Sequence, residues 1–127
     1  MNILVVEDES LVAEMLRRSL EQLGNTCLVA QDADAADRVL RDHTIEAVTL
    51  DLGMPGRAGL DWLEDVATTQ PDLARRTLVI TGRHLNSEDV ERLAWCGAGI
   101  LAKPFTMENL EEAVRAQLAH GAETRPD

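Results

Sequence analysis

Short apolar runs alternate along the chain with longer stretches in which apolar residues recur at helical spacing. A short run rich in Val, Ile and Leu predicts a buried strand, whereas apolar residues three and four positions apart predict an amphipathic helix. A helix is expected after each strand, so five strands alternate with five helices. The expected strands are Ile3–Val6, Thr26–Ala30, Ala47–Leu50, Thr77–Thr81 and Ile100–Ala102.

Capping and stop signals mark the ends of several expected helices. Gly24 should stop the first helix, Ser87 should cap the fourth, and Thr106 should cap the fifth. Residues 119–127 are polar and contain Gly and Pro, so they are expected to form a flexible tail. The sequence therefore predicts one domain over residues 1–118, followed by this C-terminal tail.

The expected strands are apolar on both faces, which is typical of a parallel sheet covered by helices on each side. The order of elements predicts an α/β fold, a doubly wound (βα)5 sandwich around a five-stranded parallel sheet. A length of 127 residues suits one such domain, with a core that needs no disulfide or structural metal. Trp62 and Trp95 fall in expected helices, and core packing is expected for both, with a partner surface as the alternative.

Acidic residues dominate the charge of the chain, with 23 Asp and Glu against 12 Lys and Arg and a net charge of -11. Such a surface repels phosphate backbones and anionic lipids, which argues against binding to nucleic acid or membranes. The N-terminus lacks signal-peptide features and the apolar runs are too short to span a bilayer, so a cytoplasmic protein is expected. Cys27 and Cys96 lack metal or redox spacing and are expected to be reduced, buried thiols.

Chemically active side chains stand at the ends of four expected strands. Lys103 is the only Lys among the 12 basic residues, and a compact ammonium is not interchangeable with the Arg fork in a tight site. In doubly wound sheets, ligands bind outside the carboxyl ends of the strands. Each residue alone could be an ordinary surface residue, but their convergence at one edge predicts a site. The order along the chain is Glu7 and Asp8 after the first strand, Asp51 after the third, Thr81 at the end of the fourth and Lys103 after the fifth.

Clustered carboxylates repel one another unless a cation joins them. Oxygen ligands of this kind suit Mg²⁺, which keeps several waters and takes one or two carboxylates plus a phosphate oxygen. A carboxylate can attack phosphorus and form an aspartyl phosphate, while a divalent cation neutralises the incoming group. Asp51 is the expected nucleophile because it stands alone after the middle strand, between the acidic pair and Lys103.

Over residues 2–118 the sequence resembles the receiver domain of bacterial two-component response regulators. Separately the shared motifs are moderate signals, but their order and spacing make the combination specific. The resemblance implies a flavodoxin-like sandwich with strand order 2-1-3-4-5. The motifs are Ile3–Glu9, Asp51–Pro55 followed by Gly59, Val79–Gly82 and Lys103–Phe105.

The resemblance also implies roles for the residues at the acidic edge. Asp51 corresponds to the phosphorylated Asp, and Asp8 corresponds to the direct ligand of Mg²⁺. Glu7 would act as a second metal ligand or through water, and the backbone carbonyl of Gly53 would complete the metal site. A magnesium-dependent phosphoacceptor is therefore expected at Asp51.

Two further positions correspond to the switching residues of the family. Thr81 matches the hydroxyl that moves to meet the phosphoryl group, and Lys103 matches the cation that contacts it, with a cis bond expected to Pro104. Family members take the phosphoryl group from a histidine kinase or a His phosphotransfer domain. They signal to an output protein through the face made by helix four, strand five and helix five, where a homodimer is also possible.

The sequence departs from the family pattern in two places. Ile100 stands where the family usually has a Tyr or Phe that swings inward, so backbone shifts after the fourth strand become the alternative route for the switch. The segment Cys96–Gly99 is one residue shorter than usual, so a different turn into the last strand is expected. Gly53 and Arg83 each follow a key residue by two positions, and we expect both to tune hydrolysis of the phosphoryl group.

Two other functions are compatible with this fold class. A phosphohydrolase with an Asp nucleophile typically has a second Asp two residues further on, and none stands there after the first or third expected strand. A degenerate receiver would be an interaction module without phosphorylation. The departure at Ile100 leaves this alternative open, but four intact residues of the acidic edge argue against it, namely Asp8, Asp51, Thr81 and Lys103. The sequence therefore predicts a signalling switch rather than an enzyme, either standing alone or as part of a longer chain.

Overall fold

The computed structural model describes residues 1–118, so the tail expected over residues 119–127 lies outside the described residues. Five parallel strands form one sheet in the order β2-β1-β3-β4-β5, which confirms the expected doubly wound topology. The strands are β1 (Asn2–Val6), β2 (Thr26–Ala30), β3 (Ala47–Leu50), β4 (Thr77–Thr81) and β5 (Gly99–Ala102).

Six helices are described over residues 1–118, one more than the five expected. The additional helix is α4, which has five residues and begins with Pro71, a favourable first helical residue. Its two buried side chains, Leu73 and Ala74, are too few to show helical spacing in the sequence. The helices are α1 (Ser10–Gln22), α2 (Ala33–Asp42), α3 (Gly59–Thr69), α4 (Pro71–Arg75), α5 (Ser87–Cys96) and α6 (Met107–Leu118).

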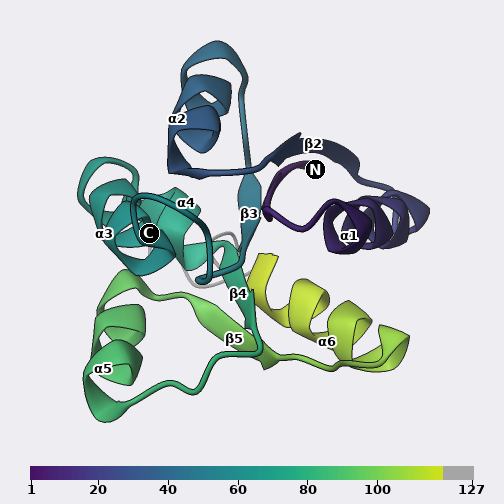
Figure 1. Cartoon of the computed structure of the whole chain (residues 1–127). Helices are drawn as coiled ribbons and strands as arrows, with labels where there is room; N and C mark the ends of the chain where they lie inside the picture. The colour runs from purple at the N-terminus through teal and green to yellow at the C-terminus, as the bar shows by residue number, and fades with distance from the viewer. Residues whose placement is uncertain (119–127) are drawn as a thin grey trace, which may run out of the picture.

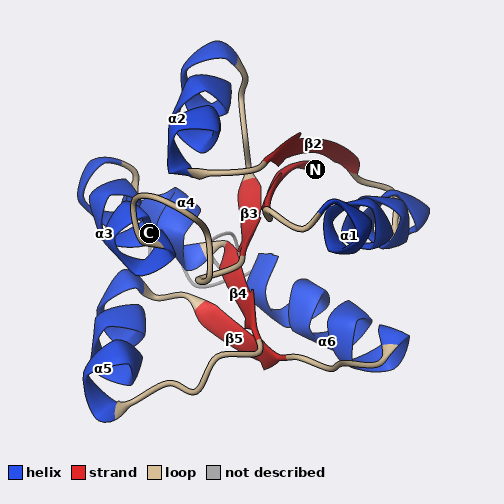
Figure 2. Cartoon of the chain, in the orientation of Figure 1, coloured by secondary structure: helices blue, strands red, loops and turns tan. Residues whose placement is uncertain are grey.

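Helices cover both faces of the sheet (Figures 1 and 2). Helices α1 and α6 lie on one face, where Ile3 and Val5 of β1 belong to the same apolar cluster as Leu16 of α1. Helices α2 to α5 lie on the other face, where Leu4 belongs to a cluster with Trp62 of α3. Successive residues of β1 are thus buried on opposite faces, which explains why its sequence is a continuous apolar run.

The N-terminus of α5 differs from the expectation. Asn86, rather than Ser87, is the capping residue, and its side chain accepts the N–H of Asp89 at 2.8 Å. The Asp89 carboxylate in turn accepts the N–H of Asn86 at 3.2 Å, which completes a capping box. Both Asn and Ser are good capping residues, and only the backbone geometry decides between two neighbours.

The two tryptophans have different environments. Trp62 is fully buried, as expected, and its indole N–H donates to Asp37 Oδ1 at 2.8 Å. Trp95 is 66% exposed, so the prediction of core packing was wrong for this residue. Helix α5 directs Leu93 and Cys96 toward the core. Trp95 stands between these two residues in the sequence, but the helical period places it on the outward side of the helix.

The free cysteines and the cap of α6 agree with the expectations from the sequence. Cys27 and Cys96 are free and buried, and the Thr106 hydroxyl caps α6 by accepting the N–H of Asn109 at 3.0 Å. The turn from α5 into β5 consists of two residues, the first of which is Gly97 in a left-handed conformation with φ of 80°. None of the helices described over residues 1–118 is long and apolar enough to cross a membrane.

Candidate functional site

The carboxyl ends of β1 and β3 bring the predicted acidic residues together. These strands pair in register from Ile3 to Val6, and the N–H of Asp51 donates to the carbonyl of Val6 at 3.0 Å. Residues that follow the two strands are consequently neighbours. One carboxylate oxygen from each of Glu7, Asp8 and Asp51 lies within 4.8 Å of the others. The three acids expected to form a site therefore form one cluster.

Lys103 reaches this cluster from the far side of β4. Its Nζ lies 3.5 Å from Glu7 Oε2 and 3.9 Å from Asp51 Oδ2. Its backbone N–H donates to the carbonyl of Thr81 at 3.0 Å, which extends the pairing of β4 and β5 by one residue. The peptide bond to Pro104 is cis. The one Lys of the chain thus places its ammonium between two carboxylates.

Glu7 is the buried member of the cluster, with 2% of its surface exposed. Burial, and then the charge of Asp51, raise the pKa of the Glu7 carboxyl from 4.5 to about 7, against the opposing effect of Lys103. The N–H of Glu9 also opposes the rise by donating to Glu7 Oε1 at 3.3 Å. Three carboxylates and one ammonium leave the cluster short of positive charge. A divalent cation with hard oxygen ligands would fit this imbalance.

Gly53 lies beside the predicted nucleophile. Its N–H donates to Asp51 Oδ1 at 3.2 Å, and a Cβ at this position would lie 3.7 Å from the same oxygen. A larger side chain at residue 53 would therefore stand directly over the Asp51 carboxylate. Residue 53 therefore borders the Asp51 carboxylate, and its tuning role stays a prediction.

Gly59 has a structural importance that its place in a motif did not reveal. It is the first residue of α3, and a Cβ there would lie 3.0 Å from both the Asp51 carbonyl oxygen and the Cα of Leu52. Real Cβ atoms rarely approach backbone atoms so closely, so the close packing of α3 against the Asp51 backbone requires glycine.

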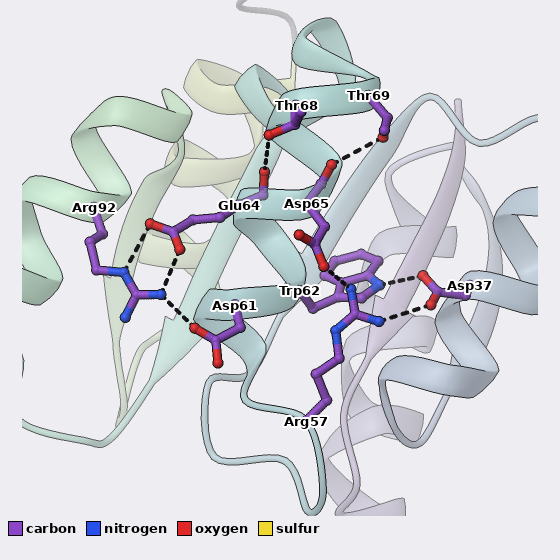
Figure 3. A network of polar contacts seen from close by, with 9 residues as sticks. All are labelled: Asp37, Arg57, Asp61, Trp62, Glu64, Asp65, Thr68, Thr69 and Arg92. Carbon is purple, nitrogen blue, oxygen red and sulfur yellow. Dashed lines mark hydrogen bonds and ion pairs between the residues drawn. The ribbon is translucent and has the colours of Figure 1, made fainter.

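Arg57 holds the loop that follows β3, and sequence reasoning missed this residue. Figure 3 shows its guanidinium between α2 and α3. It pairs with Asp37 of α2 at 3.1 Å and with Asp65 of α3, and the buried Trp62 donates to the same Asp37. Arg57 thereby ties the loop after Asp51 to both helices. Its partners are 20 and 8 residues away along the chain, so only the folded structure identifies them.

Thr81 lies at the end of β4, where it is 4% exposed. Its Oγ1 accepts the N–H of Arg83 at 3.1 Å. The side chain of Arg83 points to α5, where it pairs with Asp89 at 3.3 Å. Ile100, at the position of the usual aromatic residue, is 44% exposed and pairs through its backbone with Val79 of β4. The structure thus brings Thr81 to the edge that carries Lys103, while Ile100 lies partly at the surface.

The fold and the acidic edge together define an α/β domain with an acidic cluster that could hold a metal ion at the carboxyl ends of its parallel strands. The profile of the response regulator receiver domain family matches residues 3–115, and the chain belongs to this family. Members of the family are signalling switches rather than classical enzymes. This membership favours the switch over both alternatives, the phosphohydrolase and the unphosphorylated module.

Individual relatives agree with this family. The response regulator MprA of Mycobacterium leprae (strain TN) is 38% identical over 128 residues, which cover 100% of this chain and 54% of MprA. The chain spans about half the length of the curated relatives it matches. The non-phosphorylated receiver domain of HemR from Leptospira biflexa superposes with a TM-score of 0.83 at 26% identity, covering 99% of this chain and 98% of HemR.

A further solved structure contains a modified side chain. It is a response regulator protein from Burkholderia pseudomallei with a phosphorylated aspartic acid, a calcium ion and citrate. It superposes on this chain with a TM-score of 0.78 at 29% identity, covering 93% of this chain and 68% of that protein.

Proposed function

We propose that this chain is the phosphoacceptor of a two-component system or phosphorelay, phosphorylated on Asp51. The observation that carries the proposal is the cluster of Asp51 with Glu7 and Asp8, faced by the Lys103 ammonium 3.9 Å from Asp51. The similar Burkholderia pseudomallei protein, with its phosphorylated aspartic acid and calcium ion, supports the same chemistry here.

In this function, an Asp51 oxygen attacks the phosphorus of a phosphohistidine on a histidine kinase or a His phosphotransfer domain. The new O–P bond forms as the P–N bond breaks, and the released imidazole nitrogen recovers a proton from water. Lys103 pairs with one phosphoryl oxygen, and the Thr81 hydroxyl donates to another. The Lys103 ammonium already lies beside Asp51, so it needs little reorganisation.

Magnesium is the cation that we infer for this site. Asp8, Asp51, Glu7 and the backbone carbonyl of Gly53 would hold it, and Asp8 is exposed enough to bind a cation that keeps several waters. When bound, Mg²⁺ supplies positive charge that neutralises the incoming phosphoryl group. The geometry of this chain supports this inference, because three clustered carboxylates face the Lys103 ammonium.

Output is proposed to pass through the face of α5, β5 and α6. This is the predicted surface of helix four, strand five and helix five, renumbered because α4 is an additional helix. Val90, Trp95 and Ile100 expose apolar side chains on α5 and β5, which supports a protein-binding role, either for an output protein or for a homodimer. A cytoplasmic location and the domain limit at residue 118 belong to the same proposal.

Gly53 and Arg83 are proposed to set the lifetime of the phosphoryl group. Gly53 leaves the space over Asp51 open to water, and Arg83 follows the switch hydroxyl by two residues. An Arg83→Ala variant should therefore hydrolyse its aspartyl phosphate at a rate different from wild type. Equal lifetimes in the two proteins would remove Arg83 from this role.

Intact-mass analysis after incubation with Mg²⁺ and acetyl phosphate tests the proposed function. Wild type should gain one phosphate-sized mass, Asp51→Asn should gain none, and omission of Mg²⁺ should abolish the gain. Asp34→Asn is the matched control, because it removes an exposed Asp carboxylate of α2 outside the acidic cluster. No gain in wild type would overturn the proposal and favour the unphosphorylated interaction module.

A further inference from the structure

Helix α5 is attached to the rest of the domain by ionic contacts as well as by a short apolar face. It buries two side chains, Leu93 and Cys96, along ten residues. Figure 3 shows Arg92 of α5 reaching α3, where its Nε lies 2.9 Å from one oxygen of Glu64 and its Nη2 lies 2.6 Å from Asp61. The N-terminal end of α5 is held differently, by Arg83 from the loop after β4. Contacts of this kind hold a helix less firmly than an extensive apolar face does.

Arg83 joins the end of β4 to the start of α5. Its backbone N–H donates to Thr81 Oγ1 at 3.1 Å, and its guanidinium lies 3.3 Å from Asp89 Oδ2. The Asp89 carboxylate also accepts the N–H of Asn86, so the ion pair is connected to the capping box of α5. A movement of the Arg83 side chain would consequently change the first turn of this helix.

The same segment adjoins the phosphoacceptor. Lys103, whose Nζ lies 3.9 Å from Asp51, donates its backbone N–H to the carbonyl of Thr81. A Cβ on Gly82 would lie 3.6 Å from the Cβ of Lys103, so the chain passes close to this residue just before Arg83. Arg83 therefore begins beside the Lys of the site, and its side chain extends from there to α5.

We propose that Arg83 has two alternative partners, Asp89 before phosphorylation and the phosphoryl group of Asp51 afterwards, so that phosphorylation releases the N-terminal turn of α5. This inference rests on the proposed function. A phosphoryl group carries close to two negative charges and three acceptor oxygens, which suit the guanidinium fork. Asp89 offers a single charge and already accepts a backbone N–H. The phosphoryl group is therefore the stronger partner.

This exchange supplies a route that Ile100 does not provide. Ile100 has no aromatic ring to follow Thr81, and it is 44% exposed. Arg83, by contrast, touches both the Thr81 hydroxyl and α5 in the unphosphorylated structure. The signal reaches α5, and the exposed Trp95 near its end, through the loss of one ion pair.

The proposed change of partner is tested by measuring amide hydrogen exchange in peptides that cover residues 86–93. The measurement is made with and without Mg²⁺ and acetyl phosphate. Asp89→Asn removes the charge pair but keeps an oxygen that can accept the N–H of Asn86. Glu88→Gln is the matched control, because it removes an exposed carboxylate that forms no ion pair within residues 1–118 from the same first turn. Arg83→Ala removes the other partner, and intact mass is recorded for every sample.

In the unphosphorylated state, the amide hydrogens of these residues should exchange about two- to five-fold faster in Asp89→Asn and Arg83→Ala than in wild type. This range is the one expected for the loss of a partly exposed ion pair. Glu88→Gln should stay near wild type. Phosphorylation should accelerate wild type and Glu88→Gln by a similar factor and should add nothing to Asp89→Asn or Arg83→Ala.

Two failures are distinguishable. If wild type gains no phosphate by mass, both the proposed function and the change of partner are refuted. If wild type gains phosphate but its α5 turn exchanges at an unchanged rate, the change of partner alone is overturned. Phosphorylation that accelerates Asp89→Asn as much as wild type would also overturn it, because the ion pair would then not be the link.

Discussion

Replacing Glu7 by Gln should change how the stability of the metal-free protein depends on pH. Burial and the charge of Asp51 raise the pKa of Glu7 to about 7 in the folded protein, from 4.5. Between these two values the folded state keeps a proton that the unfolded chain has released. The contribution of the protonated Glu7 to the free energy of unfolding is therefore fully present below about pH 4.5 and is lost as the pH rises to about 7.

The magnitude follows from the difference in pKa. Each unit corresponds to about 1.4 kcal/mol, so the free energy of unfolding of wild type should fall by up to about 3 kcal/mol between these pH values because of Glu7. Gln has no proton to lose and should remove this slope. At pH 8 without metal, Glu7→Gln should therefore be more stable than wild type, whereas near pH 5 the two should be similar.

Urea unfolding followed by circular dichroism at several pH values, in the presence of EDTA, measures this effect. Glu9→Gln is the matched control, because it removes a neighbouring exposed carboxylate outside the acidic cluster and should leave the slope in place. Saturating Mg²⁺ at pH 8 should raise the midpoint of wild type more than that of Glu7→Gln. Equal slopes for wild type and Glu7→Gln would refute the reasoning.

Four further substitutions test the packing around the site by urea unfolding. Gly59→Ala should destabilise the protein by about 1–3 kcal/mol because a Cβ meets backbone at 3.0 Å, while Gly53→Ala, with 3.7 Å of space, should cost much less. Thr49→Val should stabilise it by about 1 kcal/mol, since the buried Thr49 hydroxyl has no hydrogen-bond partner among residues 1–118. Trp62→Phe should destabilise it by about 1–3 kcal/mol through the lost bond to Asp37 and the lost volume.

Each of these expectations has a clear contrary result. Equal costs for alanine at Gly59 and Gly53 would show that α3 can move away from the Asp51 backbone. A Thr49→Val variant less stable than wild type would mean that the hydroxyl is bonded in solution, for example to a buried water. A neutral Trp62→Phe would show that the bond to Asp37 contributes nothing beyond what it costs to form.

The sheet and the acidic edge could be predicted from the sequence because both follow from simple periodicity. A parallel strand buried on two faces is a continuous apolar run, and the residue after each run lies at the ligand-binding edge. Asp51 and Lys103 are 52 positions apart, yet the rule places both at the same edge. The strands could therefore be predicted without knowledge of tertiary contacts.

The features that could not be predicted depend on such contacts. Helix α4 has two buried side chains, which give no periodic pattern. Asn86 and Ser87 are equally good capping residues as far as their types show, and Trp95 lies next to a buried position without being buried itself. The partners of Arg57 and Arg92 come from other helices, so no local spacing reveals them.

The division of work between Lys and Arg gives the site its character. Lys103 is the one Lys among 12 basic residues, and its compact ammonium lies 3.5 and 3.9 Å from two carboxylates that would also hold a cation. Arg57 instead uses the guanidinium fork to join carboxylates of α2 and α3, and Arg92 of α5 uses it to bind two carboxylates of α3. The compact ammonium of Lys suits a crowded site where a phosphoryl group and a metal ion would meet. The planar guanidinium of Arg suits contacts with two carboxylates at once. Arg83 lies between the acidic cluster and α5, because its N–H contacts Thr81 and its guanidinium pairs with Asp89. The change of partner proposed for Arg83 would therefore connect the phosphorylation site to α5.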